Sequence, residues 1–141
     1  MGARESKSGL SACRFHGQAA IHAATEAARA FAAGESLARD DAAHLCIVIE
    51  ELVTNLLDHG GVGPDQDIEL ALRHDAGSIA IILTDPGTPF DPRTAILPDG
   101  PNAERGGGAG LDLVRAWTQI VRYASRDGRN RLELVLPISA V

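Results

Sequence analysis

The chain has 141 residues, of which 45% are hydrophobic and 23% are charged, and its formal net charge is −6. This length and composition suit a single globular domain, whose core must be largely aliphatic because aromatic residues make up only 4% of the chain. The acidic balance argues against a nucleic-acid surface, which requires clustered Lys and Arg side chains.

The cysteines and the apolar runs exclude further classes of protein. Cys13 and Cys46 have neither the spacing of metal ligands nor the density of a disulfide framework. No apolar run approaches the ~20 residues that a helix needs to span a bilayer, and the first residues lack a hydrophobic signal segment. We therefore expect a cytoplasmic protein in a reducing setting, with neither a membrane nor a nucleic acid as a direct partner.

The N-terminal part of the chain is predicted to contain a tail, a strand and a helix. Residues 1–11 are polar and are predicted to form a flexible tail, and residues 12–141 are predicted to form one domain. A short strand is expected over residues 12–15. The Ala-rich stretch 17–33 has high helix propensity, and Gly34 is expected to end that helix.

A second helix is predicted over residues 37–59. Ser36 or Asp40 is expected to be its N-cap, and Gly60 and Gly61 are expected to stop it. Its apolar residues recur at helical spacing and so form one face. These residues are Leu45, Val48, Ile49, Leu52, Val53 and Leu56.

Three polar residues of this helix, Glu51, Asn55 and His59, follow one another at four-residue steps. At about 100° per residue they form a strip beside the apolar face, with Asn55 next in angle to Val48. Such a strip lies at the rim of a pocket between the helix and the layer on which it packs. The alternative is an amphipathic helix with an ordinary polar flank.

Strands and one more helix are predicted in the second half of the chain. Residues 67–74 alternate and residues 78–85 are strongly apolar, so together they predict a hairpin. The connection over residues 88–109 carries four prolines and a glycine run, and connections of this length are usually functional. Residues 111–119 predict a helix, and strands on either side of the turn 126–130 predict a final hairpin.

The order of these elements separates the helices from the antiparallel strands. Helix, helix, hairpin, long loop, helix and hairpin together predict a two-layer α+β sandwich. The alternating βαβ order of a Rossmann or P-loop domain is absent, and the P-loop phosphate motif does not occur.

The segment LTDPGTPFDP, residues 83–92, places Asp85 directly after an apolar strand. A carboxylate at a buried strand end is costly unless it accepts a hydrogen bond. An amino group on a flat ligand ring can donate that bond, and Gly87 would let the ring approach the backbone. The alternative is a turn aspartate that ends the strand.

A glycine run, ERGGGAGLDLV over residues 104–114, leads directly into the third predicted helix. Backbone N–H groups at such a helix start can bind phosphate, helped by the helix dipole. The alternative is a flexible hinge.

The three motifs occur in one order on one α+β sequence, and residues 12–137 resemble the GHKL superfamily of ATP-binding domains. The resemblance is closest to its small bacterial branch, the anti-sigma-factor serine/threonine kinases, because of the ELVTN…HG helix and the DPGTPFDP segment. It implies a mixed, mostly antiparallel sheet that helices cover on one face, with an ATP lid around residues 88–109.

The resemblance also implies roles for individual residues. Glu51 corresponds to the general base of the kinase branch, Asn55 to the ligand of the Mg²⁺ that bridges the ATP phosphates, and His59 to a residue near those phosphates. Asp85 corresponds to the aspartate that accepts a hydrogen bond from the adenine amino group, and Gly87 lies under the ring.

The remaining family positions lie in the lid and the glycine motif. Phe90 is expected to pack at the base of the lid, and Leu111 to open the following helix. Arg105 is not a family position, but as a cation beside an anion site it is expected to reach the terminal phosphate. Four glycines are expected to wrap the phosphates: Gly106, Gly107, Gly108 and Gly110.

The function that the resemblance implies is an ATP- and Mg²⁺-dependent protein-serine/threonine kinase that is also an anti-sigma factor. It would phosphorylate a STAS-type anti-anti-sigma protein, sequester a sigma factor and form a homodimer. One alternative is a non-catalytic module whose bound nucleotide switches partner binding. A histidine-kinase catalytic domain is disfavoured because no long dimerisation helix precedes the first predicted helix.

Overall fold

The computed structural model describes residues 9–93 and 107–139, and of residues 107–110 it describes the backbone. Residues 1–8 of the predicted tail 1–11 and most of the predicted lid lie outside the described residues, and residues 10 and 11 belong to the first strand. In chain order the elements are β1 (Leu10–Phe15), α1 (Ala19–Gly34), α2 (Arg39–Asp58), β2 (Ile68–Asp75), β3 (Ser78–Asp85), α3 (Gly107–Trp117), β4 (Gln119–Arg126) and β5 (Arg129–Pro137).

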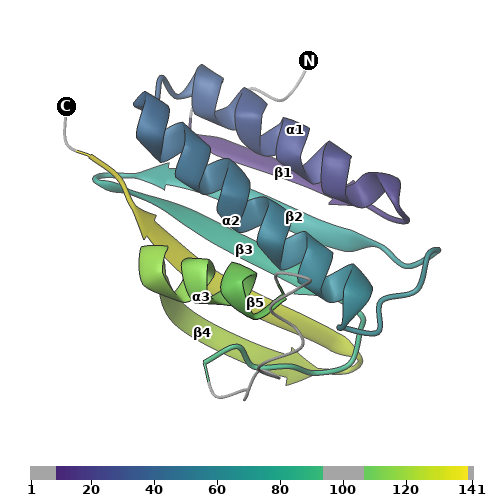
Figure 1. Cartoon of the computed structure of the whole chain (residues 1–141). Coiled ribbons are helices and arrows are strands. Elements are labelled where there is room, and N and C mark those ends of the chain that lie inside the picture. The colour runs from purple at the N-terminus through teal and green to yellow at the C-terminus, as the bar shows by residue number, and fades with distance from the viewer. Residues whose placement is uncertain (1–8, 94–106, 140–141) are drawn as a thin grey trace.

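The five strands form one sheet in the order β1-β2-β3-β5-β4. Both predicted hairpins are confirmed, since β2 pairs with β3 and β4 pairs with β5. All three helices lie over one face of the sheet (Figure 1), so the predicted two-layer α+β sandwich is confirmed. The expected mixed sheet is wrong for the described strands, because every neighbouring pair is antiparallel.

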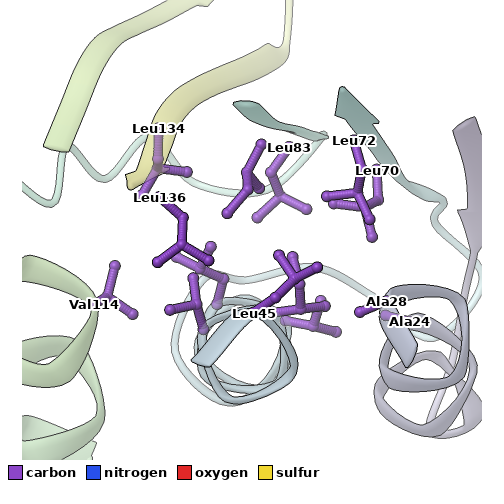
Figure 2. Close-up of a cluster of buried hydrophobic side chains, with 14 of the residues drawn as sticks. Ala24, Ala28, Leu45, Leu70, Leu72, Leu83, Val114, Leu134 and Leu136 are labelled. Atoms are coloured by element: carbon purple, nitrogen blue, oxygen red, sulfur yellow. The ribbon is translucent and has the colours of Figure 1, made fainter. Parts of the chain in front are cut away.

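The core fills the space between the sheet and the helices. Strands β2, β3 and β5 each turn alternate apolar residues toward the helices, as the two-residue period of a strand requires. Figure 2 shows these side chains meeting Leu45 of α2, Val114 of α3 and the small residues Ala24 and Ala28 of α1. Each buried Leu, Ile or Val contributes about 1.5–3 kcal/mol to folding, so this layer fixes where the helix ends lie.

The junction between α1 and α2 differs from the expected capping. Ser36 has a φ of 56°, and the Leu37 amide donates to the Ala32 carbonyl over 3.0 Å. Ser36 is therefore the left-handed residue that closes α1. The N-cap of α2 is Ala38, which makes no side-chain cap bond, and Asp40 lies inside the first turn. The expectation that Ser36 or Asp40 caps α2 is wrong.

The C-terminal end of α2 agrees with its predicted stop. The helix ends at Asp58, the Gly60 amide donates to the Leu56 carbonyl over 3.0 Å, and Gly61 has a φ of 73°, which favours glycine. Among the described helices, none is both long and apolar enough to cross a membrane.

The third helix begins earlier than expected. Gly107 is the first residue of α3, so Leu111 lies inside this helix and does not open it. Glycine has low helix propensity, but helices in proteins are held mostly by tertiary packing of an apolar face. Leu111 and Val114 provide that packing, because both are buried in the core.

Candidate nucleotide site

A small cavity of ≈ 30 Å³ lies where the C-terminal half of α2 meets the sheet. It brings together four of the predicted site residues, Asn55, Asp85, Phe90 and Leu111. Its volume holds no more than a few water molecules, so its walls must separate before a purine can enter. The other lining residues are Leu52, Leu56, Leu83, Pro92, Tyr123 and Leu132.

A larger hollow of ≈ 550 Å³ lies elsewhere, on the sheet face turned away from the helices. It is lined by Arg14, Glu69 and Thr84, among others, and contains none of the predicted site residues. Its charged groups are already paired, for example Arg14 with Glu69 over 3.3 Å. We therefore locate the candidate site at the small cavity, where Asn55 and Asp85 converge and neither forms an ion pair with another described residue.

Asp85 ends β3 and its residue is only 6% exposed. Its Oδ1 accepts hydrogen bonds from the Gly87 amide over 2.7 Å and from Asn130 Nδ2 over 3.0 Å. The bond to Gly87 is that of a turn aspartate, as the alternative interpretation predicted, and the contact of Asp85 with a ligand ring stays a prediction. Within the described part of the chain no donor contacts Oδ2, which leaves one oxygen for a ligand.

Gly87 follows in this turn, and its neighbours explain why glycine is needed there. An added Cβ would lie 2.2 Å from the Gly60 carbonyl oxygen and 2.9 Å from a Val62 methyl group. The next amide, that of Thr88, donates to the same Gly60 oxygen over 2.8 Å. The loop after α2 thus docks on the turn after β3, which joins the two predicted motifs. Glycine is therefore needed at position 87 for the contact with Gly60, whether or not a ligand ring also approaches the backbone there.

Glu51, Asn55 and His59 lie at the expected places along α2. Glu51 and Asn55 are half-buried, while His59 is exposed and is the C-cap residue, whose amide donates to the Asn55 carbonyl. Burial, and to a lesser degree the like charge of Glu50, raises the pKa of the Glu51 carboxyl. No hydrogen bond or ion pair to these three side chains occurs within residues 9–93 and 107–139.

The remaining wall of the cavity is built by Phe90, Pro92 and Tyr123. The Phe90 amide donates to Tyr123 Oη over 2.8 Å, and Arg115 Nε of α3 donates to the Pro92 carbonyl over 3.0 Å. Burial raises the pKa of the Tyr123 hydroxyl, with Asp85 among the further causes. Phe90 packs against the core at the last described stretch before residue 94.

Asn130 and Tyr123 are site residues that the sequence interpretation missed. Asn130 is 3% exposed and touches Asp85 directly. A signal for it was present, because Asn130 is in phase with the apolar alternation of its own strand. That alternation runs through Leu132, Leu134 and Leu136.

Only part of the glycine motif lies among the residues that the structure describes. Gly107, Gly108 and Gly110 lie in the first turns of α3, where a phosphate-binding helix start was predicted. Gly106 and Arg105 lie outside the described residues, so their predicted contacts with phosphate stay predictions.

Metal binding is tested by the side chains present. Among the described residues, no three or more His, Cys, Asp or Glu side chains are grouped to hold a metal ion. Asn55 offers one amide oxygen at the cavity, and Mg²⁺ is commonly held by one or two protein oxygens together with phosphate oxygens and water. Asn55 therefore fits a metal that a nucleotide brings with it and does not make a resident metal centre.

The helices over an antiparallel sheet and the cavity between α2 and β3 fit a nucleotide-binding class of domain. Residues 17–136 match the histidine kinase-like ATPase domain, and the chain belongs to this family. The predicted resemblance to GHKL ATP-binding domains is thereby confirmed, and ATP is the ligand that membership implies.

A comparison with an individual protein indicates a kinase-type member of this family. The serine/threonine-protein kinase BtrW of Bordetella bronchiseptica is 30% identical to this chain over 94 residues. The aligned region covers 64% of this chain and 66% of the relative's length. The similarity to a protein of that name agrees with a kinase-type ATP-binding domain.

Proposed function

We propose that this chain is a protein-serine/threonine kinase that uses ATP and Mg²⁺. The observation that carries the proposal is that Asn55 and Asp85 line one cavity, with Glu51 one helical turn before Asn55. In this proposal Asp85 offers a carboxylate oxygen to the base, Asn55 an amide oxygen to a phosphate-bound metal, and Glu51 a proton acceptor.

The chemistry follows from these residue types. The Asp85 Oδ2 atom would accept a hydrogen bond from the adenine amino group, and the phosphates would lie near the glycine turns of α3. Mg²⁺ bound with the nucleotide supplies charge neutralisation for phosphoryl transfer. Asn55 would hold that metal through its side-chain oxygen, and backbone N–H groups at the start of α3 would attract the phosphates.

Glu51 is proposed as the general base. Burial raises the pKa of the Glu51 carboxyl, and a higher pKa makes its carboxylate a stronger proton acceptor for a hydroxyl. The hydroxyl oxygen of a substrate serine or threonine forms a bond to the γ-phosphorus, the bond from that phosphorus to the bridging oxygen of ADP breaks, and Glu51 takes the hydroxyl proton.

The partners belong to the same proposal. We propose a STAS-type anti-anti-sigma protein as the phosphorylated substrate, a sigma factor as the sequestered partner and a homodimer as the working form. The name of the relative, a serine/threonine-protein kinase, supports the reaction class alone. These partners rest on the likeness of the helix and turn motifs to the anti-sigma-factor kinases.

The first experiment is a calorimetric titration with ATP, with and without Mg²⁺. We expect Mg²⁺ to strengthen ATP binding to the wild-type protein and the Asn55→Ala variant to lose that gain, because it removes the amide oxygen. Thr54→Ala, on the neighbouring position of α2, is the matched control and should keep the gain. If neither ATP nor ADP binds at millimolar concentration, the proposal is wrong.

Phosphotransfer separates a kinase from a nucleotide-gated binding module. With labelled ATP and a STAS-type substrate, Glu51→Gln should lower the transfer rate by about 10²–10⁴-fold, the usual contribution of a general base, with ATP affinity kept. Glu50→Gln is the control, since Glu50 is exposed on the neighbouring position. ATP binding without transfer by the wild-type protein would favour the module.

A further inference from the structure

Three polar side chains form a row across neighbouring strands at the edge of the candidate site. In the strand register Asp85 of β3 is opposite Asn130 of β5, and Asn130 is opposite Ser125 of β4. Asn130 is the centre of the row and is almost fully buried. A buried amide is retained only where its donors and acceptor are satisfied, so its contacts define what the row does.

The hydrogen bonds of the row have one consistent direction. Asn130 Nδ2 lies 3.0 Å from Asp85 Oδ1 and 2.9 Å from the Gly87 carbonyl oxygen. Both of these atoms are acceptors, so the NH₂ group of Asn130 must face them. Asn130 Oδ1 then accepts from the Ser125 hydroxyl over 2.7 Å. The inverted amide would place its oxygen against two acceptors.

This direction fixes the carboxylate of Asp85. Oδ1 receives two donors, Asn130 Nδ2 and the Gly87 amide, and a rotation of the carboxylate would break both bonds. Oδ2 has no donor among the described residues, and Asp85 lines the cavity. The row therefore presents a single, oriented acceptor to whatever enters.

We propose that Asn130, itself held by Ser125, is a positioning residue that makes Asp85 select purine nucleotides with a 6-amino group. The inference rests on the proposed nucleotide site and adds a specificity determinant to it. A 6-amino group donates to the fixed Oδ2. A 6-oxo group places an acceptor there, and a purine with hydrogen at this position offers nothing to the carboxylate. Asn130 acts through Asp85 and does not touch the base.

The test compares two ligands that differ only at that position. Binding of ATP and of purine riboside triphosphate, which lacks the 6-amino group, is measured by calorimetry for the wild type, Asn130→Ala and Ser125→Ala. Ser125 is exposed on an edge strand, so its variant keeps the test valid if Asn130→Ala does not fold. Thr84→Ala is the matched control, because Thr84 precedes Asp85 and lies on the opposite face of the sheet.

We expect the wild type to prefer ATP. Misdirecting one hydrogen bond to a charged acceptor should lower ATP affinity about tenfold in Asn130→Ala and about threefold in Ser125→Ala. Affinity for the desamino nucleotide should stay within about twofold in both variants, since the bond at issue is never made. Thr84→Ala should change neither affinity.

Each other outcome has a definite meaning. Equal losses for both nucleotides would show that the row only supports the fold, and they would overturn the inference. An undiminished preference for ATP in both variants would do the same. If the wild type binds both nucleotides equally, the inference fails while the proposed nucleotide site stands. If the wild type binds neither, the proposed function fails and takes the inference with it.

Discussion

The Asp85 end and the Asn55 end of the candidate site differ in how their polar groups are satisfied. At the first end a buried carboxylate is held by Gly87 and Asn130. At the second, the half-buried side chains of Glu51 and Asn55 have no described hydrogen-bond partner. At the Asp85 end the fold satisfies Oδ1 and leaves only Oδ2 for a ligand, whereas at the Asn55 end both side chains are left for water or a ligand.

The difference follows from the elements that carry the two ends. Asp85 ends a central strand under the helices, where an unsatisfied carboxylate would cost about 1–3 kcal/mol or more, so neighbouring strands supply donors. Glu51 and Asn55 lie on the edge of a helix beside an open rim, where water can satisfy them. The fixed carboxylate of the Asp85 end suits recognition of an uncharged nucleotide base. The open Asn55 end suits phosphates, which bring their own charge and metal.

The largest loss of ATP affinity is expected from a substitution at the Asp85 end of the site. In Asp85→Asn, the oxygen keeps the two donors at the Oδ1 position and the new NH₂ group takes the place of Oδ2. A donor then faces the amino group of adenine, and we expect ATP affinity to fall about 10- to 100-fold. Calorimetric titration measures it.

Asp75→Asn is the matched control for that change. Asp75 ends β2 as Asp85 ends β3, but it does not line the cavity. Its Oδ1 lies 2.9 Å from Arg73 Nε, with which it forms an ion pair. Its variant should bind ATP as the wild type does. Unchanged ATP binding by Asp85→Asn would show that this carboxylate does not read the base.

A smaller effect is expected where the two ends are joined. In Gly87→Ala the new methyl group would lie 2.2 Å from the Gly60 oxygen, which is backbone and cannot step aside alone. We expect a loss of about 1–3 kcal/mol in the free energy of unfolding, as is usual for overpacking. Urea denaturation measures this loss.

Gly34→Ala is its control, because an added Cβ at Gly34 has no described neighbour within 4 Å and needs no positive φ. That variant should be neutral or slightly more stable, since alanine restricts the unfolded chain more than glycine does. Equal stability of Gly87→Ala and the wild type would mean that the loop after α2 can separate from the turn after β3 without loss of stability.

The sequence was sufficient for the parts of this molecule that rest on periodicity. The alternation in residues 67–74 and the helical spacing from Leu45 to Leu56 predicted β2, α2 and the two-layer fold. The helix boundaries were less secure: Ser36 adopts a left-handed conformation that an ordinary N-cap does not use, and α3 includes glycines whose propensity opposes a helix. Tertiary packing decided both.

The site was predicted residue by residue only where a motif is local. Asp85 and Gly87 are two positions apart, so their turn is visible in the sequence. Asn130 is 45 positions from Asp85, and only the pairing of β3 with β5 brings them together. Its polar character within an apolar alternation marks it as unusual without revealing its partner.

The smallest expected effect is the contribution of Glu51 to the pH dependence of stability, which tests whether this side chain has a partner. Burial raises the pKa of Glu51, so the folded protein binds its proton more tightly than the unfolded chain does. The resulting destabilisation is absent below the unfolded pKa, grows as pH rises from the ordinary value of 4.5 through the higher folded pKa, and is then constant.

Glu51→Gln should therefore be more stable than the wild type at pH 7 and equally stable at low pH. Glu51 is only half-buried, so the gain should stay within about 0.5 kcal/mol. Urea denaturation at the two pH values measures it. Glu50→Gln removes the like charge and should give a smaller gain with the same sign. A Glu51→Gln variant that is less stable at pH 7 would mean that the carboxylate has a partner in the folded protein, and the Asn55 end would then resemble the Asp85 end.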